Sequence, residues 1–253
     1  FVAQLLNEAG LPKGVLNVVN GGKEAVDTLL TDERVQAVSF VGSTAIAKYI
    51  YKTASENDKR CQALGGAKNH AIVMQDAEME NTVNALIGAA FGSSGERCMA
   101  ISVVVAVGSE TADNLIAGLK SKMNDLKVGN FDNSKNDFGP LITKDHMEKV
   151  KGYITSAEAQ GADIVVDGRS VNVKGCENGF YVGGTLIDCV EASMESYQNE
   201  IFGPVLQVVR VETMQQAIDL IDEHEYGNGT CIFTRDGEAA RYFSDQIKVG
   251  MVG

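Results

Sequence analysis

The sequence predicts an α/β protein whose sheet is mostly parallel. Two observations support this prediction. Short apolar segments rich in β-branched residues, such as residues 101–107 and 205–211, alternate with longer segments whose apolar residues recur at helical spacing. Turns that contain glycine separate the two kinds of segment. Regular alternation of strands and helices is typical of a parallel sheet covered by helices.

The first part of the chain, residues 1–66, contains a short series of these units. A helix at the start is followed by expected strands at 14–19, 35–40 and 61–64 and expected helices at 23–30 and 45–54. Gly42-Ser43-Thr44 joins the strand at 35–40 to its helix. Ser43 or Thr44 can cap that helix, but the free N–H groups at a helix start also suit a phosphate. Taken alone, the turn fits either interpretation.

The alternation starts again after Gly66, so we place a domain boundary there and expect a second domain at 67–253. Its expected strands are residues 70–74, 101–107, 163–166, 180–188, 205–211, 231–233 and 249–252. Its expected helices are residues 81–91, 111–126, 144–160, 214–224 and 238–247. A polar connection at 129–143 is expected on the surface, without a chemical role. His224, in the last turn of its helix, is expected to be a favourable charge there.

Composition excludes several classes of function. The 253 residues carry a formal net charge of -12, which argues against nucleic acid or an anionic membrane as the main partner. No apolar run approaches the roughly 18 residues that a membrane span needs. Five cysteines without a CxxC pair indicate a reducing compartment and neither a disulfide framework nor a zinc site. Three histidines without HxxxH spacing make a metal site unexpected.

Residues 91–100, Phe-Gly-Ser-Ser-Gly-Glu-Arg-Cys-Met-Ala, are the main candidate for a functional segment. The glycines and serines let the backbone bend sharply and place Cys98 at the end of a turn. Arg97 would favour the thiolate, because a cation within about 4–6 Å stabilises negative charge, whereas Glu96 at similar distance would oppose it. The residues alone leave two interpretations open, an activated nucleophile or a small buried thiol.

Gly95-Glu96-Arg97-Cys98 resembles the catalytic-cysteine motif of the aldehyde dehydrogenases. Residues 63–70, Ala-Leu-Gly-Gly-Ala-Lys-Asn-His, and residues 95–100 are similar to the methylmalonate-semialdehyde dehydrogenases, the branch that transfers its acyl group to coenzyme A. The resemblance covers the whole chain. It implies the second part of a Rossmann-type NAD-binding domain at 1–66, followed by an α/β catalytic domain at 67–253. It also implies a piece of a longer protein, without the front of the cofactor domain and the C-terminal segment.

The resemblance implies NAD as the cofactor. Phe40, Gly42 and Ser43 match the turn that lies against the NAD pyrophosphate, and Gly65 belongs to the glycine pair after the next strand. Glu200 and Phe202 match the segment that contacts the nicotinamide ribose and ring. A carboxylate can accept hydrogen bonds from two ribose hydroxyls. The residues alone also allow a solvated Glu200 in a turn before a strand.

By the same resemblance, Cys98 attacks an aldehyde and becomes a thioester, and Arg97 holds the carboxylate of a semialdehyde acid. Most aldehyde dehydrogenases carry a glutamate before Leu-Gly-Gly that activates water. This chain has Ala63, and an alignment shifted to allow for Ala67 finds no carboxylate either. Because water without a general base is a poor nucleophile, the departure favours transfer to coenzyme A. The predicted products from malonate or methylmalonate semialdehyde are acetyl-CoA or propionyl-CoA.

Two other functions stay open from the sequence. One is a hydrolytic aldehyde dehydrogenase of different specificity. The other is a non-catalytic fragment that acts as a folding or interaction domain. The resemblance implies a small-molecule semialdehyde as partner and a homo-oligomer, dimer or tetramer, for the full-length protein. It places the protein inside the cell, in the mitochondrial matrix of a eukaryote or the cytoplasm of a bacterium.

Overall fold

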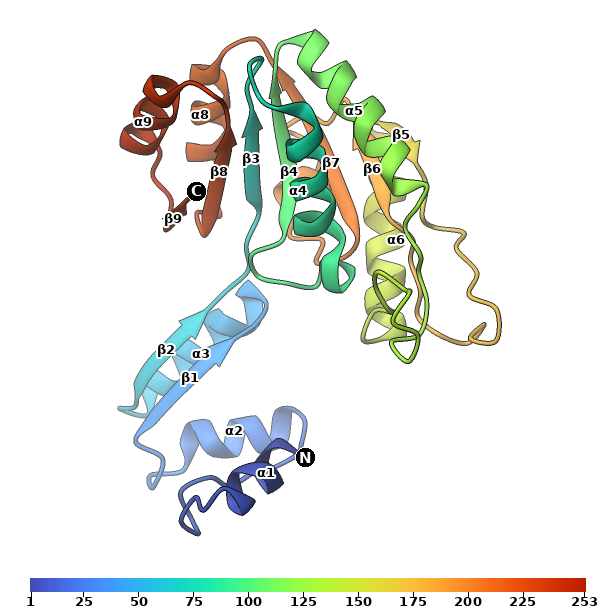
Figure 1. The fold of residues 1–253 in the computed structure, drawn as a ribbon. Helices are drawn as coiled ribbons and strands as arrows, with labels where there is room; N and C mark the ends of the chain where they lie inside the picture. Colours follow the sequence, from blue (N-terminus) through green and yellow to red (C-terminus); the bar gives the residue numbers. More distant parts are fainter. The chain divides into compact units, whose positions relative to one another are not determined.

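The computed structural model describes residues 1–253 as two compact units, Phe1–Gly66 and Ala67–Gly253. Strands and helices alternate along both units, so the predicted α/β class is confirmed (Figure 1). The roles of the two units in cofactor binding and catalysis stay predictions. None of the helices combines the length and the apolar character that crossing a membrane requires.

The first unit contains a two-stranded parallel sheet. Its elements are α1 (Val2–Glu8), α2 (Lys23–Thr31), β1 (Ala37–Val41), α3 (Thr44–Glu56) and β2 (Arg60–Leu64). The strands pair so that Phe40 lies beside Ala63. A small core forms where Leu30 of α2 meets Ile50 and Ala54 of α3. Val38, Phe40 and Cys61 pack against this core from one face of the sheet, because strand side chains alternate between faces.

The predicted strand at 14–19 is wrong. These residues form turns and irregular backbone between α1 and α2, and their apolar side chains, such as Val15 and Val19, are exposed. An apolar segment becomes a strand only when a neighbouring strand pairs with its backbone. The sheet of this unit contains β1 and β2 alone, so residues 14–19 have no such neighbour.

The second unit is built on a seven-stranded sheet with the order β5-β6-β7-β4-β3-β8-β9. All neighbouring strands are parallel except the β5–β6 pair at one edge. The strands are β3 (Asn69–Val73), β4 (Ile101–Val107), β5 (Asp163–Val166), β6 (Thr185–Asp188), β7 (Val205–Val211), β8 (Gly229–Phe233) and β9 (Met251–Val252). The central strands are buried on both faces, as parallel sheets between helical layers usually are.

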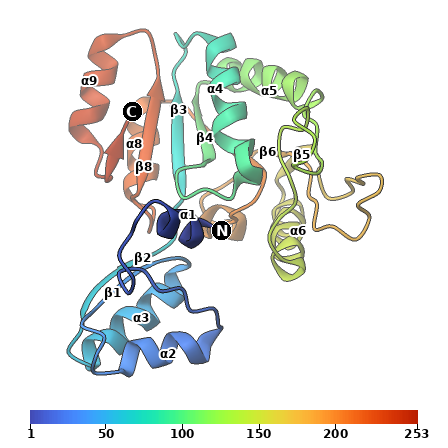
Figure 2. The same cartoon turned by 60° about the horizontal axis from the view of Figure 1, so that its bottom comes forward.

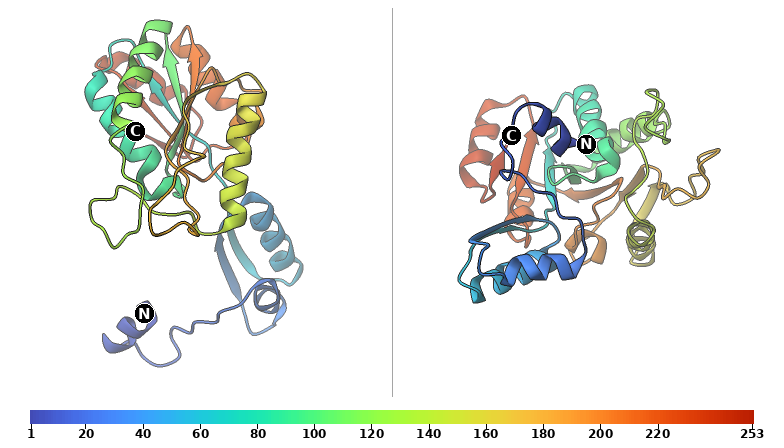
Figure 3. Two further views of the ribbon diagram at one scale, coloured as in Figure 1. Left: turned by 90° about the vertical axis from the view of Figure 1, so that its right-hand side faces the viewer. Right: turned by 90° about the horizontal axis from the view of Figure 1, so that it is seen from below.

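Helices cover both faces of this sheet. They are α4 (Met79–Phe91), the 3-10 turn η1 (Gly92–Gly95), α5 (Ser109–Met123), α6 (Lys144–Ala159), the short α7 (Glu195–Gln198), α8 (Met214–Asp222) and α9 (Gly237–Gln246). One core joins α4 and α5 to Val104 and Ala106 of β4. The other joins α6, α8 and α9 to Val103 and Val105 of the same strand. Figures 2 and 3 show the two helical layers on opposite sides of the sheet.

Two further predictions differ from the structure. The strand expected at 180–188 is regular only at Thr185–Asp188, because residues 180 and 183 make single hydrogen bonds to Leu141 and Gly168 instead of a ladder. The connection at 129–143 was expected to be superficial, but Phe138 and Leu141 are buried.

Candidate active site

The site lies at the amino ends of β3, β4, β7 and β8, on the turn that joins α4 to β4 (Figure 1). Ser93, Ser94 and Gly95 follow one another with φ angles of 51°, 58° and 70°. Three consecutive left-handed residues reverse the chain sharply, which is costly for a non-glycine residue. Ser94 Oγ donates to the Gly139 carbonyl at 2.8 Å, so the connection at 129–143 supports this reversal. Cys98 emerges from it exposed.

The Cys98 turn, residues 96–100, is held by side-chain amides. Asn69 Nδ2 donates to the carbonyl oxygens of Cys98 and Ala100, each at 2.9 Å. Asn228 Nδ2 donates to the same Cys98 carbonyl at 3.0 Å. The Cys98 N–H makes no hydrogen bond within the chain. The turn therefore presents a fixed thiol beside an unused backbone donor.

The Glu200 loop, residues 199–204, meets the Cys98 turn. Gly95 lies so close to Gly203 that a Cβ atom added at Gly95 would stand 2.2 Å from the Gly203 carbonyl oxygen. Together the two segments line one pocket, in which the structure brings Arg97, Cys98, Glu200 and Phe202 together. Phe202 is left-handed, with a φ of 56°, and its side chain is partly exposed. These four predicted site residues come from motifs about a hundred positions apart.

The Glu200 carboxylate has one protein donor. The Ala67 N–H donates to Glu200 Oε1 at 2.9 Å, and Oε2 makes no hydrogen bond within the chain. Lys68, the next residue, is buried, and its Nζ donates to the carbonyls of Ser196 and Asn199 at 2.6 and 2.8 Å. Burial lowers the pKa of Lys68 to about 7, against the opposing effect of the Glu200 charge. No motif in the sequence assigned a role to Lys68.

Arg97 has a partner that the sequence did not predict. Its Nη2 donates to the carbonyls of Gly88 and Ala89 at 2.7 and 2.8 Å, near the C-terminus of α4. A cation is favourable at that end of a helix. Nε and Nη1 make no hydrogen bond within the chain. Arg97 is therefore anchored at the end of α4 through one of its three nitrogen atoms.

Glu96 and His146 join α6 to both segments. His146 Nε2 donates to the Phe202 carbonyl at 2.7 Å, since a carbonyl can only accept, and lies 3.7 Å from Glu96 Oε1. Burial raises the pKa of Glu96, while His146 acts in the opposite direction. His146 is thus a support for the Phe202 backbone that no local motif indicated.

A polar cluster lies behind the Glu200 loop. Buried His70 places Nε2 at 3.0 Å from the Tyr197 hydroxyl. His224 Nε2 donates to the Tyr197 carbonyl at 3.2 Å, and its Nδ1 accepts from the Tyr226 N–H at 3.1 Å. These contacts match a neutral imidazole, and burial lowers the pKa of His224. The predicted role of His224 as a helix-end charge therefore does not fit the structure.

The predicted cofactor residues of the first unit gather where β1 and β2 end. Ser43 occupies the N-cap position of α3, but its side chain makes no capping hydrogen bond. Thr44 Oγ1 instead accepts from the Gly66 N–H at 3.0 Å. The ring of Phe40 covers Gly42, and Gly65 packs closely against Thr44. A side chain at Gly42 would overlap the Phe40 ring, and one at Gly65 would press on Thr44, so both positions favour glycine.

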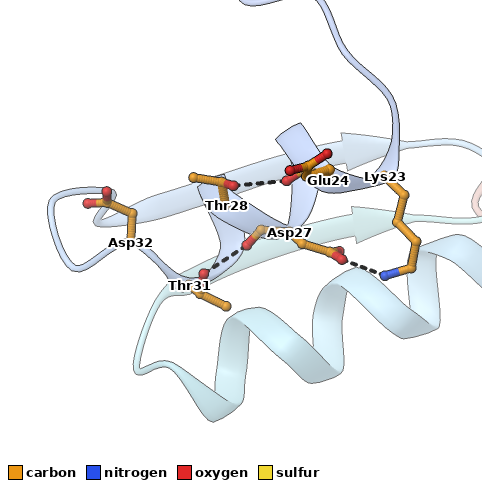
Figure 4. A pocket seen from close by; sticks show the side chains of 6 residues that line it. All are labelled: Lys23, Glu24, Asp27, Thr28, Thr31 and Asp32. Carbon is orange, nitrogen blue, oxygen red and sulfur yellow. Dashed lines mark hydrogen bonds and ion pairs between the residues drawn. The ribbon is translucent and has the colours of Figure 1, made fainter.

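A separate surface hollow follows α2 (Figure 4). Its lining residues mostly bond to one another: Lys23 pairs with Asp27, and Thr28 and Thr31 donate to backbone carbonyls one turn earlier. No predicted site residue lines it. The hollow therefore carries no functional argument.

The known proteins that are similar to this chain all belong to one family of enzymes. The sequence model of the aldehyde dehydrogenase family matches residues 1–253. Malonate-semialdehyde dehydrogenase of Pseudomonas aeruginosa is 61% identical over 253 residues, which is 100% of this chain and 51% of that protein. The crystal structure of methylmalonate-semialdehyde dehydrogenase from Oceanimonas doudoroffii is 73% identical with a TM-score of 0.97, and the match covers 100% of this chain and 52% of that one.

A more distant structure has the same fold. Betaine aldehyde dehydrogenase of Staphylococcus aureus in complex with NAD+ is 30% identical with a TM-score of 0.93, over 99% of this chain and 50% of that one. The chain therefore spans about half the length of the relatives it matches.

Proposed function

Since the chain belongs to the aldehyde dehydrogenase family, we propose that its full-length protein oxidises malonate or methylmalonate semialdehyde with NAD and transfers the acyl group to coenzyme A. The observation that carries this proposal is the shared pocket of Cys98, Arg97, Glu200 and Phe202. It combines a nucleophile, a cation for a carboxylate, a carboxylate for ribose hydroxyls and an aromatic ring. Names of the relatives support the choice of semialdehyde.

The residues fit NAD in both units. In the second unit, the unbonded Oε2 of Glu200 can accept from a ribose hydroxyl, and the exposed part of the Phe202 ring can contact a flat heterocycle. In the first unit, the start of α3 has an unbonded Ser43 side chain, and Gly42 and Gly65 stand beside it. We assign the ribose to Glu200 and the pyrophosphate to the Ser43 turn. Bound NAD would supply the hydride acceptor.

Cys98 is the proposed nucleophile. Its thiolate sulfur bonds to the aldehyde carbon, and the carbonyl oxygen becomes an oxyanion. The unused Cys98 N–H is suited to donate to that oxygen. Loss of the aldehyde hydrogen as hydride leaves an acyl thioester on the sulfur. Arg97 lines the same pocket, where its guanidinium can hold the substrate carboxylate during these steps.

The proposed acyl acceptor is coenzyme A. Ala63 is half-buried on the face of β2 that packs against α3, whereas Leu64 is exposed on the other face. Neither side chain can activate water. The thiolate of coenzyme A displaces the Cys98 thiolate from the acyl carbon, so the enzyme returns to its starting form. Loss of carbon dioxide from the acid group, with uptake of one proton from water at the carbon that it leaves, accounts for acetyl-CoA or propionyl-CoA as the product.

The test is a product assay on the full-length protein with both semialdehydes and NAD, with and without coenzyme A. We expect NADH together with acetyl-CoA or propionyl-CoA, and much slower turnover without the thiol. We expect Cys98→Ser to abolish the NADH burst. Free acid formed at a rate independent of coenzyme A would instead identify a hydrolytic enzyme, and a normal burst from Cys98→Ser would remove the nucleophile assignment.

A further inference from the structure

Three consecutive residues contact the two segments that form the pocket. Ala67, Lys68 and Asn69 lie at the start of central strand β3, which is hydrogen-bonded to β4 on one side and β8 on the other. Successive side chains of an extended chain point to opposite sides. Lys68 and Asn69 can therefore reach different segments from adjacent positions. A rigid central strand is a suitable place from which to hold both.

Lys68 holds the Glu200 loop. Its side chain is 2% exposed, and its Nζ donates to the Ser196 and Asn199 carbonyls, at the end of α7 just before Glu200. A lysine side chain at a helix C-terminus can hydrogen-bond the unpaired carbonyls there. The Ala67 N–H contributes a third hydrogen bond, directly to the Glu200 carboxylate. The loop and its functional side chain are thus both tied to residues 67 and 68.

Asn69 holds the Cys98 turn. Its side chain is also 2% exposed, and Nδ2 donates to the carbonyls of Cys98 and Ala100 on either side of Met99. Asn228, just before β8, donates to the same Cys98 carbonyl. Neither asparagine contacts the Glu200 loop through a hydrogen bond. The contacts of Lys68 and Asn69 are therefore separate in space and can be tested separately.

We infer that Lys68 and Asn69 are positioning residues for the reaction: Lys68 orients Glu200 for the cofactor ribose, and Asn69 orients Cys98 for the aldehyde. This inference rests on the proposed function. A general role in stability would affect both steps alike, whereas this inference assigns Lys68 to cofactor binding and Asn69 to the reaction of the thiol. Loss of Lys68 weakens NAD binding, whereas loss of Asn69 slows acylation of Cys98 without weakening NAD binding.

The experiment compares Lys68→Met and Asn69→Ala in the full-length protein. NAD affinity is measured by calorimetric titration, and acylation by the rate of the NADH burst at saturating NAD and aldehyde. We expect Lys68→Met to raise the Kd for NAD by about tenfold, which is the size of one lost hydrogen bond. We expect Asn69→Ala to leave that Kd within about twofold and to slow the burst by about tenfold.

Two further variants keep the comparison interpretable. Lys68→Gln retains amide donors without the charge and replaces Lys68→Met if that variant does not fold, and Asn228→Ala tests the same Cys98 carbonyl from an exposed position. Arg210→Met, at the other end of β7, removes ion pairs with Asp188 and Asp113 and should change neither readout.

Equal effects of Lys68→Met and Asn69→Ala on both readouts, or an unchanged Kd in Lys68→Met, would overturn the inference. A wild-type protein that binds NAD but oxidises no semialdehyde would count against the proposed function instead. In that case the Kd comparison still tests Lys68, and the burst with another aldehyde tests Asn69.

Discussion

Gly95 and Gly203 touch at the point where the two motifs of the pocket meet. A Cβ atom at Gly95 would lie 2.2 Å from the Gly203 oxygen, and one at Gly203 would lie 2.7 Å from a methyl group of Val150 on α6. Real Cβ atoms do not approach other atoms so closely, so any larger residue at either position would clash with its neighbour. The separation between Cys98 and Glu200 therefore depends on two positions that carry no side chain.

We predict that Gly95→Ala destroys the site. The substitution combines a left-handed φ of 70° with the clash against Gly203. These costs are about 1–2 and about 1–3 kcal/mol, which together are a large share of the stability of a domain. A lower melting temperature and loss of the NADH burst are the expected results. Gly152→Ala is the control, because this exposed helical glycine has open space around it and should gain about 0.5–1 kcal/mol. Unchanged activity in Gly95→Ala would show that the two segments can separate without consequence.

We predict that Arg97→Ala raises KM for the semialdehyde acids by about 10- to 100-fold, since hydrogen bonds to a charged partner contribute about 1.5–3 kcal/mol. An uncharged aldehyde of similar size should show a much smaller change. Because Arg97 also bonds to the end of α4, a small loss of melting temperature is expected with either substrate. Steady-state kinetics with both substrates measure the difference. Equal increases in KM would leave Arg97 only its role at the helix.

Much of the fold followed from local patterns. The bounds of β4, β5 and β7 agree with the expected residues, because each is an apolar run between clear turn signals. The segment at 14–19 has the same composition but no neighbouring strand. Composition indicates the tendency to form a strand, whereas pairing depends on the rest of the sheet.

For a similar reason, only some of the residues at the candidate site were predicted from the sequence. Cys98, Glu200 and Phe202 belong to motifs, and the predicted family is confirmed by the comparisons. Lys68, Asn69 and His146 were not predicted, because their partners lie between 29 and 131 residues away along the chain. The sequence did contain one indication of such a role, namely a lysine and an asparagine at the start of a strand expected to be buried. Buried polar groups need partners, and that need is visible before the partners are known.

We predict that His70 makes the protein sensitive to acid. Burial lowers the pKa of His70 to about 3, and nearby His224 and Lys68 act in the same direction. In the unfolded chain its pKa is about 6.5. Between pH 6.5 and 3 the unfolded state therefore binds up to one more proton than the folded state. As the pH is lowered through this range, the free energy of unfolding decreases by up to about 1.4 kcal/mol per pH unit. Above pH 6.5 this contribution is constant.

The measurement for His70 is the melting temperature of wild type and His70→Gln between pH 7.5 and 4.5. Glutamine can keep a hydrogen bond to the Tyr197 hydroxyl but does not titrate. We expect His70→Gln to be less stable at pH 7.5 and to lose less stability on acidification, so that the two curves converge. Other titrating groups, including His224, contribute to both proteins and cancel in the difference. Parallel curves over the whole range would show that His70 has the same proton affinity in the folded and unfolded states, which its buried contact with Tyr197 does not allow.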